Sequence, residues 1–278
     1  MKVRFFYIFL SLCTIAAVCL AYGFFLEPKR LVIREVSLPA PSYQGPPLRI
    51  VLLSDLHIGG RHVPASRISA LTNAVNHLKP DVVLLAGDYV DGSLPRSNRS
   101  VEANTVIDQG LKALAGIKSS LGTFAVIGNH DNWYDGAWIK RQLEENGATV
   151  LGNEGLNLPE ICLIGMSDFY TDYPSSAGYR DCNSDLAGIV LTHSPDAFRF
   201  LRTDTALAVA GHTHGGQINL PLIGRRVTST EAGKPLAYGL KDVGGVPVYI
   251  TAGIGTSLLP ARFRAPPEIV VITLLEAG

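Results

Sequence analysis

Short apolar runs that each stop at a cluster of polar side chains constrain this chain more than any other feature. The runs at residues 48–53, 81–86 and 122–127 lead into Asp55-Leu56-His57, Gly87-Asp88 and Gly128-Asn129-His130-Asp131. Runs of this length between turn residues are typical of strands buried on both faces. Because open parallel sheets collect ligands at the carboxyl ends of their strands, we expect the three clusters to lie together.

The pattern between the runs predicts that strands and helices alternate. Apolar residues at helical spacing predict a helix over residues 65–79, which Pro80 ends. A strand, a helix and a second strand in this order form a parallel pair with a right-handed crossover. Further helices are expected at 101–117 and 137–146, and further strands at 148–151, 161–164, 188–191, 207–210, 246–251 and 269–274. The interval 167–184 lacks apolar periodicity and is expected to be a loop that overhangs the site.

Two more polar clusters follow apolar runs in the second half of the chain, and they complete a candidate metal site. They are the lone His193 and the segment Gly211-His212-Thr213-His214. Nitrogen and oxygen donors without thiolate suit divalent Mn, Fe, Zn, Ni or Co. The candidate ligands are Asp55, His57, Asp88, Asn129, His193, His212 and His214. His193 alone is better explained as an ordinary polar residue at a strand end, but no structural need explains the whole set.

The spacing of these ligands suggests a particular chemistry. If the backbone stays extended, alternation puts Asp55 and His57 on the same side of the chain. An aspartate between two cations can bridge them. Two ions about 3.5 to 4 Å apart can clamp the attacking and leaving oxygens of a phosphoryl displacement and make a hydroxide nucleophile available near neutral pH.

Length and charge set broad limits. The chain has 278 residues, enough for one large domain and an N-terminal segment. Its formal net charge of zero gives no excess of basic residues of the kind that binds nucleic acid, so duplex binding is not expected. Four cysteines are too few and too scattered for a disulfide framework or a cysteine zinc site. Outside the N-terminal apolar segment only Cys162 and Cys182 could pair, and the sequence leaves that open.

The N-terminal segment predicts a membrane anchor. Residues 5–26 carry no charge and are long enough to cross a hydrocarbon core of about 30 Å. We expect residues 1–28 to be the anchor, 29–47 a linker with a strand-like piece at 31–36, and 48–278 the catalytic domain. The alternative is a cleaved signal peptide with a site after Cys19-Leu20-Ala21, for which the apolar run is long. Basic residues on both sides of the run leave the membrane face of the domain open.

The five clusters, in this order over most of residues 48–275, resemble the signature of the calcineurin-like metallophosphoesterases. That signature is DxH, GDxxD, GNH(D/E), a later single His and GHxH, and every element is present here. The resemblance implies an α/β fold, specifically a four-layer αββα sandwich of two mixed sheets with helices outside. It also implies a hydrolase with two divalent metal ions that acts on phosphoric ester or pyrophosphate bonds.

The resemblance also implies a role for each residue. Asp55, His57 and His214 would hold the first metal, Asn129, His193 and His212 the second, and Asp88 would bridge them. His130 would act as general acid or stabilise charge on the phosphate, and Asp131 would set its tautomer. Asp91 would play a supporting role.

A narrower resemblance covers residues 215–218, 220–226 and 253–262, which are similar to a membrane-anchored bacterial branch of this superfamily. Members of that branch are described as phosphodiesterases, and some hydrolyse the pyrophosphate of UDP-2,3-diacylglucosamine in lipid A synthesis. The resemblance implies a single-pass protein of the bacterial plasma membrane with a phosphorylated small-molecule or lipid-linked substrate. The alternatives are a phosphatase or nuclease with a soluble substrate, and a non-catalytic binding protein of the same fold, against which the complete ligand set argues.

Other side chains near the clusters allow two interpretations each. Trp133, Tyr134 and Trp138 could wall a substrate pocket, but packing over the following helix is the expected role. Arg61 and His62 could touch a substrate phosphate or lie in a solvated loop. The pairs Arg225-Arg226 and Arg262/Arg264 could bind an anionic substrate or lipid headgroups. For each basic pair alone, an exposed basic turn is the expected outcome.

Overall fold

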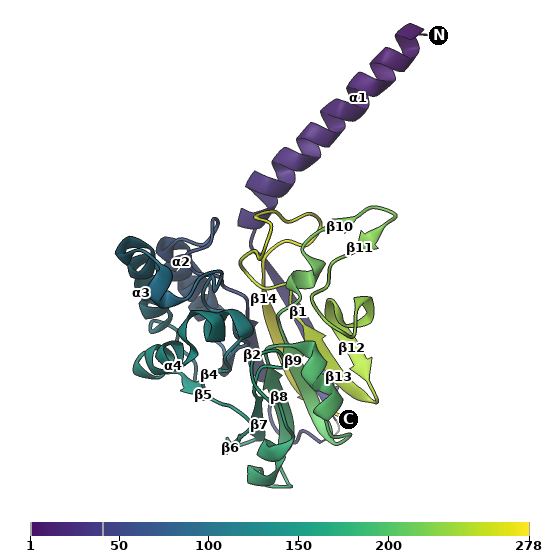
Figure 1. The fold of residues 1–278 in the computed structure, drawn as a ribbon. Helices are drawn as coiled ribbons and strands as arrows, with labels where there is room; N and C mark the ends of the chain where they lie inside the picture. The colour runs from purple at the N-terminus through teal and green to yellow at the C-terminus, as the bar shows by residue number, and fades with distance from the viewer. Residues whose placement is uncertain (1, 41, 278) are drawn as a thin grey trace.

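A computed structural model describes residues 2–40 and 42–277 of the chain. A long helix, α1 (Lys2–Ala21), projects from one end of a domain built from two packed sheets. Figure 1 shows the helix standing clear of the domain, which holds all the other helices and strands. The expected α/β fold with two mixed sheets is confirmed.

The first sheet carries the three strands that precede the first polar clusters. It has six strands in the order β1 (Val32–Ala40), β14 (Glu268–Glu276), β2 (Leu48–Leu53), β3 (Val82–Leu85), β4 (Gly122–Ala125) and β5 (Thr149–Val150). Strands β2 to β5 are parallel, so the carboxyl ends of β2, β3 and β4 meet at one edge as expected. Strand β14 runs antiparallel to β2 and parallel to β1.

The second sheet carries the two later clusters. Its order is β12 (Gly239–Val243), β13 (Val246–Ile250), β9 (Thr205–Ala210), β8 (Ala187–Thr192), β7 (Ile161–Met166) and β6 (Gly155–Asn157). The four central strands are parallel, and β12 and β6 are antiparallel to their neighbours. A separate hairpin, β10 (Asn219–Leu220) with β11 (Gly224–Arg225), follows the last polar cluster. Strands β12, β6, β10 and β11 were not predicted from the sequence.

The main core lies between the two sheets. Ile50, Leu52 and Leu84 of the first sheet share one buried cluster with Leu163 and Leu191 of the second. The outer faces are apolar too, because the alternate residues of these strands lie in two further buried clusters. This explains why the strands are continuous apolar runs rather than alternating ones.

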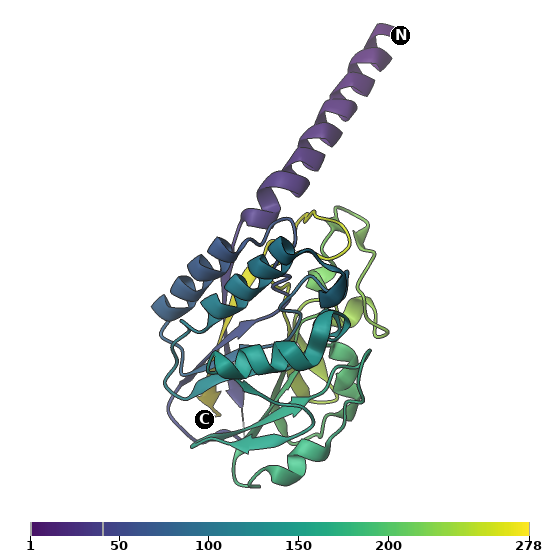
Figure 2. The same ribbon diagram turned by 60° about the vertical axis from the view of Figure 1, so that its left-hand side comes forward.

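Three helices cover the outer face of the first sheet, as Figure 2 shows. They are α2 (Ala65–His77), α3 (Val101–Leu114) and α4 (Asn129–Glu145). Helix α2 buries Ile68, Leu71 and Val75, the residues whose spacing predicted it. Helix α4 begins at Asn129 rather than near residue 137, and its two parts meet at Asp135, which has non-helical dihedral angles.

The outer face of the second sheet is covered differently from the expected sandwich. Short 3-10 helices at Ala177–Asp181 and Pro195–Phe200 take the place of α-helices there. Phe198 and Tyr179 from these turns pack against the sheet. The sequence of this region lacks the apolar periodicity that a longer helix would need, so the fourth layer is built from short helical turns.

The strand-like piece expected at 31–36 is confirmed, but the strand is longer than expected, because residues 32–40 form the edge strand β1 and belong to the domain rather than to a linker. This strand pairs with β14 from Val32 to Ala40. Leu38 and Ala40 are buried in the core between the sheets. Pro39 has no N–H to donate, and an edge strand tolerates that loss. Pro41 of the predicted linker lies outside the described residues.

Two cysteines are joined in the domain. A disulfide links Cys162 of β7 to Cys182, which directly follows the short helix Ala177–Asp181, with the Cα atoms 5.7 Å apart. The sequence left this pairing open.

Candidate metal centre

The five polar clusters meet at the carboxyl edges of the two sheets. Asp55 and His57 follow β2, Asp88 follows β3, and Asn129 opens α4 just after β4. His193 follows β8, and His212 and His214 follow β9. All of these side chains are buried except His212, which is partly exposed. The structure therefore brings together all seven residues that the sequence singled out as metal ligands.

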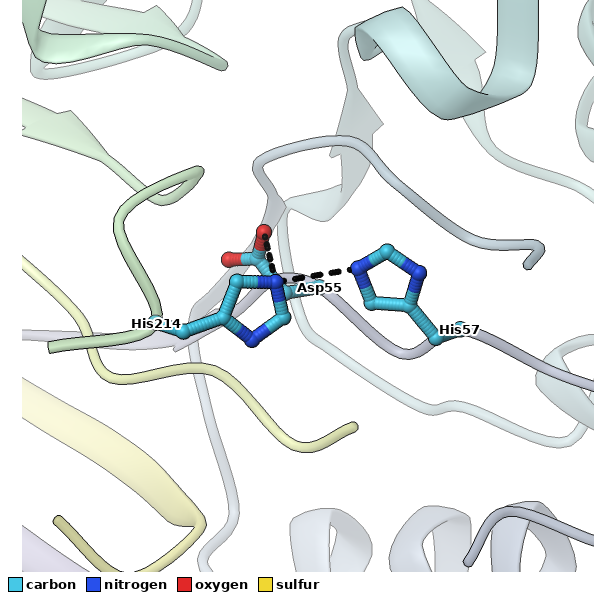
Figure 3. Close-up of side chains that lie close together, drawn as sticks. All are labelled: Asp55, His57 and His214. Atoms are coloured by element: carbon cyan, nitrogen blue, oxygen red, sulfur yellow. Dashed lines mark hydrogen bonds and ion pairs between the residues drawn. The ribbon is translucent and has the colours of Figure 1, made fainter. Parts of the chain in front are cut away.

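One group consists of Asp55, His57 and His214, shown in Figure 3. The Nε2 atoms of His57 and His214 lie 3.0 Å apart, and Nε2 of His214 lies 3.6 Å from Oδ1 of Asp55. Two imidazole nitrogens and a carboxylate oxygen thus point at one small volume. That donor set fits a divalent cation of the first transition series or zinc.

A second group surrounds His193. Its Nε2 atom lies 3.1 Å from Oδ1 of Asn129 and 3.1 Å from Nδ1 of His212. The other ring nitrogen, Nδ1, bonds the carbonyl oxygen of Ala86 at 2.7 Å. Because a carbonyl can only accept, Nδ1 carries a proton. Burial opposes a second proton, but the carboxylate of Asp88 beside Nε2 raises the pKa of His193 well above its usual value, so a cation would bind Nε2 by displacing that proton. A backbone contact of this kind orients a histidine ligand toward its metal.

Asp88 lies between the two groups. Its Oδ2 atom is 3.3 Å from Nε2 of His193 and 3.7 Å from Nε2 of His57. Its Oδ1 atom accepts a hydrogen bond from the backbone N–H of His130 at 2.9 Å. One carboxylate oxygen therefore faces both groups, a position from which a carboxylate could bridge two cations.

The protonation of the site suits cation binding. Burial lowers the pKa of His57 to about 3 and that of His212 to about 4, and it holds the pKa of His214 well below its usual value. These rings are neutral at physiological pH, so their lone pairs are available to a metal. Burial also raises the pKa of Asp55 to about 7, so this carboxylate needs a positive neighbour to be fully ionised.

Several ligand residues have a strained backbone. Asp55, His57, Asp88, His212 and His214 have φ angles between +49° and +67°. The left-handed conformation costs a residue with a side chain about 1 to 2 kcal/mol. Strain of this kind is typical of functional sites, where the surrounding structure enforces it. The extended backbone on which the same-side expectation for Asp55 and His57 depended is therefore absent.

Glycines allow the clusters to pack this closely. A Cβ atom on Gly128 would lie 2.3 Å from Oδ1 of Asp88, and one on Gly211 would lie 1.8 Å from Oγ of Ser54. Any side chain at either position would displace a ligand loop. Sequence reasoning missed two further glycines as parts of the site, Gly253 and Gly255, whose Cβ atoms would press on Asp55 and His57. The only signal for them was the resemblance of residues 253–262 to a family branch.

Asp131 does not orient His130 by direct contact, which corrects the expectation. Its two carboxylate oxygens accept hydrogen bonds from backbone N–H groups of Asp88, Tyr89, Val90 and Gly128. Asp131 thus clamps the loop after β3 to the start of α4, and so positions Asp88. Among the described residues, Nδ1 of His130 is buried and has no hydrogen-bond partner.

A cavity of about 1070 Å³ opens over the two groups. Its wall includes Asp88, Asn129, His130, His212 and His214, together with two aromatic residues. Trp133 is one of them and is 51% exposed, so the expectation that it packs over the helix is wrong. Tyr134 and Trp138 do pack against the core as expected. The ring of Trp133 lies 4.8 Å from that of His130.

The other aromatic residue confirms that the loop 167–184 overhangs the site. The ring of Tyr170 stacks on His212, with the ring centres 4.8 Å apart. Its hydroxyl donates to Asp196 at 2.7 Å, which fixes the loop to the outer layer of the second sheet.

Arg262, for which an exposed basic turn was expected, and His62, for which a solvated loop was one of two interpretations, are both buried. Arg262 is fully buried and donates to the carbonyl groups of Ala252, Gly255 and Ala265. His62 is buried too and bonds the carbonyl oxygen of Pro260 at 2.9 Å. Neither is a free surface group, so both help to hold the loop that forms one wall of the cavity.

Comparison with known proteins decides the family. Residues 48–216 match the model of the calcineurin-like phosphoesterase family. The chain belongs to this family. The metallophosphoesterase YkuE of Bacillus subtilis is 31% identical over 266 residues, which cover 91% of this chain and 88% of YkuE. The phosphodiesterase YaeI of Escherichia coli is 33% identical over 239 residues, 82% of this chain and 83% of YaeI.

A zebrafish relative is named as a transmembrane protein. The transmembrane protein with metallophosphoesterase domain of Danio rerio is 30% identical over 286 aligned residues, which cover 95% of this chain and 62% of that protein. Calcineurin-like phosphoesterases use divalent metal ions, and the Asp and His groups described above are positioned to hold them. This metallophosphoesterase is a hydrolase that acts on phosphoester bonds.

Proposed function

We propose that this metallophosphoesterase cleaves a phosphodiester or pyrophosphate bond in a membrane-associated substrate. The observation that carries the proposal is the position of Asp88, whose Oδ2 atom lies within 3.7 Å of a histidine nitrogen from each group. A single carboxylate shared between two ligand groups fits two adjacent cations and does not fit two independent sites.

The ligands divide between two cations as follows. Asp55, His57 and His214 hold one, Asn129, His193 and His212 hold the other, and Asp88 is shared. When bound, two such cations supply Lewis acidity for the phosphoryl oxygens and activate water near neutral pH. Burial keeps His57, His212 and His214 neutral, and a backbone contact to Ala86 fixes the orientation of His193. Manganese, iron and zinc all suit this donor set.

His130 is the proposed proton donor to the leaving group, or a donor of a hydrogen bond to the phosphoryl oxygens. Its backbone N–H is fixed to Asp88, and its ring lies in the cavity wall between His57 and Trp133. The ring nitrogen Nδ1 has no partner among the described residues, so the orientation of the ring comes from packing against its aromatic neighbours. A general acid must lie within reach of the atom that it protonates, and this wall position meets that need.

The substrate is proposed to reside in the membrane that α1 crosses. This helix is long and apolar enough to span a bilayer. A bacterial plasma membrane is the proposed location, and UDP-2,3-diacylglucosamine of lipid A synthesis is the concrete candidate, because its pyrophosphate is joined to a group with two acyl chains. The YaeI relative is named a phosphodiesterase, which supports diester cleavage in this fold. A soluble-substrate phosphatase or nuclease is the competing function.

The test compares three substrates with the full-length protein in lipid nanodiscs, loaded in turn with manganese, iron or zinc. The substrates are bis(4-nitrophenyl) phosphate, 4-nitrophenyl phosphate and UDP-2,3-diacylglucosamine. We expect the diester to be cleaved faster than the monoester, and the acylated substrate fastest. Rapid diester cleavage with no turnover of the acylated sugar would remove the lipid A assignment. Monoester cleavage above diester cleavage would favour the phosphatase.

A further inference from the structure

Exposed apolar residues gather at the end of the domain from which α1 leaves. They belong to two segments, the β10–β11 hairpin with its flanks and the loop at 256–260. We call this set the apolar rim: Leu220, Leu222, Ile223, Val227, Leu258 and Leu259. Leu222 is fully exposed and Leu258 is 96% exposed. Figure 1 shows the hairpin and the loop beside the base of α1.

The rim holds its two most exposed leucines in strained conformations. Leu222 has φ +65° and Leu258 has φ +59°, a region that residues with side chains avoid. The loop that carries Leu258 is tied down rather than loose. The side chain of Gln217 donates to the carbonyl groups of Ser257 and Leu259 and accepts from the N–H of Ser257. The structure therefore displays these leucines to the outside at a cost in backbone energy.

The same end of the domain is fixed to the membrane helix. The N–H of Arg262 donates to the carbonyl oxygen of Gly23 at 2.9 Å, and the N–H of Ala265 donates to Oε1 of the buried Glu27 at 2.7 Å. The rings of Tyr22 and Phe263 meet edge to face, 6.3 Å apart. Residues 22–27, which directly follow α1, are thus joined by direct contacts to residues 262–265, which directly follow the loop at 256–260. The direction in which α1 leaves the domain therefore fixes which face of the domain meets a bilayer.

Charge around the rim suits lipid headgroups. The exposed basic residues Lys29 and Arg30 follow the helix, and the exposed Arg226 and Arg264 border the hairpin and the loop. Basic residues next to a membrane-spanning helix attract anionic headgroups. Exposed apolar residues with exposed basic residues next to them in the chain suit an anionic bilayer surface, whose hydrocarbon takes up the apolar side chains and whose phosphates attract the basic ones.

An apolar groove connects the rim with the metal centre. It has a volume of about 300 Å³, and Ile218, Leu220 and Val227 line it. His214, Leu258 and Leu259 line both this groove and the cavity over the metal ligands. A molecule with a hydrocarbon part and a phosphoryl group could therefore reach the ligands from the side on which the rim lies.

We propose that the apolar rim docks into the surface of an anionic lipid bilayer, so that the metal cavity opens at the level of the headgroups. The inference rests on the proposed membrane anchoring by α1, but not on the identity of the substrate or on turnover. It makes the rim a second membrane contact, one that sets how the catalytic domain sits on the bilayer.

Site-directed fluorescence tests the proposal with the full-length chain. Cys13 and Cys19 are replaced by serine, the Cys162–Cys182 disulfide is kept, and one cysteine is introduced by Leu222→Cys, Leu258→Cys or Leu240→Cys. Leu240 is the matched control, since it is 43% exposed on β12, which lies away from the helix in Figure 1. Each cysteine carries a polarity-sensitive dye, and the protein is placed in nanodiscs of phosphatidylcholine with phosphatidylglycerol.

Nitroxide-labelled lipids are expected to quench the dye at positions 222 and 258 several-fold more than at position 240, and dissolved iodide to show the opposite order. Equal iodide quenching at all three positions would overturn the proposal. If the protection of positions 222 and 258 from iodide disappears when each nanodisc holds a single chain, a second copy of the protein covers the rim. That result would also overturn the proposal. Hydrolysis of bis(4-nitrophenyl) phosphate by the same preparations reports separately on the proposed function.

Discussion

The carboxylate of Asp131 accepts a hydrogen bond from the backbone N–H of Asp88 at 2.8 Å. Three more N–H groups, from Tyr89, Val90 and Gly128, converge on the same carboxylate. Asp131, which was expected to set the tautomer of His130, thus holds Asp88, the proposed shared ligand, in place. A substitution there should disturb the metal site through the loop and leave the chemistry of His130 alone.

Asp131→Asn would place an NH₂ group against backbone donors, since one amide oxygen cannot accept from all four. A buried donor without a partner costs about 1 to 3 kcal/mol. We expect a lower thermal unfolding midpoint and weaker metal retention, measured by calorimetry and by elemental analysis after dialysis. The dependence of the remaining turnover on leaving-group pKa should match that of the wild type. If the dependence on leaving-group pKa changes while the metal content stays full, Asp131 acts through His130 after all.

Asp88→Asn keeps the size of the side chain and the acceptor for His130 N–H but removes the charge shared by the two ligand groups. We expect turnover of bis(4-nitrophenyl) phosphate to fall by more than about a hundredfold, because the shared carboxylate is what permits two cations to lie close together. Asp242→Asn on β12 is the matched control and should retain activity. Wild-type turnover in Asp88→Asn with intact metal content would exclude the bridging role.

His130→Ala should leave the metal content near that of the wild type, because His130 is not among the seven ligands. If it protonates the leaving group, the loss of rate will be large for phenyl or alkyl leaving groups and small for 4-nitrophenolate, which leaves without help. His77→Ala in α2, an exposed histidine, serves as the control. Equal losses for all leaving groups would favour charge stabilisation on the phosphoryl oxygens, and loss of the metals would refute both roles.

The Cys162–Cys182 disulfide makes a prediction about membrane topology. Disulfides persist in oxidising compartments, so we expect the catalytic domain on the side of the membrane away from the cytoplasm. UDP-linked sugars are made in the cytoplasm, so this topology would count against UDP-2,3-diacylglucosamine and in favour of another membrane-associated phosphodiester. Protein extracted under alkylating conditions and then denatured should show only Cys13 and Cys19 as reactive thiols by mass spectrometry. Modification of all four cysteines without prior reduction would place the domain in a reducing compartment.

Cys182→Ser should lower the free energy of unfolding by roughly 3 kcal/mol for a closed loop of this size.

The apolar N-terminal segment should remain part of the mature chain. Contacts of Gly23 and Glu27 with the loop at 262–265 make the end of the helix part of the domain surface. Intact mass measurement of protein from the membrane fraction should therefore include residues 2–21. A mature chain that starts at Tyr22 would show that the segment is a cleaved signal peptide.

The sequence predicted which polar side chains come together better than it predicted the architecture around them. Asp55, Asp88 and His193 follow buried parallel strands, and parallel strands bring their carboxyl ends together whatever the loops do. For the edge strand β1 the sequence predicted only a strand-like piece at 31–36 within a linker. Pro39 and Pro41 interrupt the pattern, and the partner strand β14 lies more than two hundred residues away in the chain. A strand that pairs only with a distant segment leaves little local signal.

The roles of single residues were harder to predict, because they depend on which atoms meet. Asp131 next to His130 in sequence suggested a direct contact, but the turn of α4 directs its carboxylate toward the loop after β3. The sequence around Arg262 predicts an exposed basic turn. In the structure the loop at 252–265 folds around this residue, and its guanidinium donates hydrogen bonds to three backbone carbonyl groups. The left-handed backbone at Asp55 and His57 likewise depends on the assembled site and has no signal in the sequence.

Anomalous diffraction from crystals of the manganese-loaded full-length protein tests the central claim most directly. Data collected on both sides of the manganese absorption edge should show two peaks about 3.5 to 4 Å apart. One should lie between His57 and His214, the other beside His193 and His212, with Asp88 touching both. A single peak, or a pair that Asp88 does not join, would contradict the account.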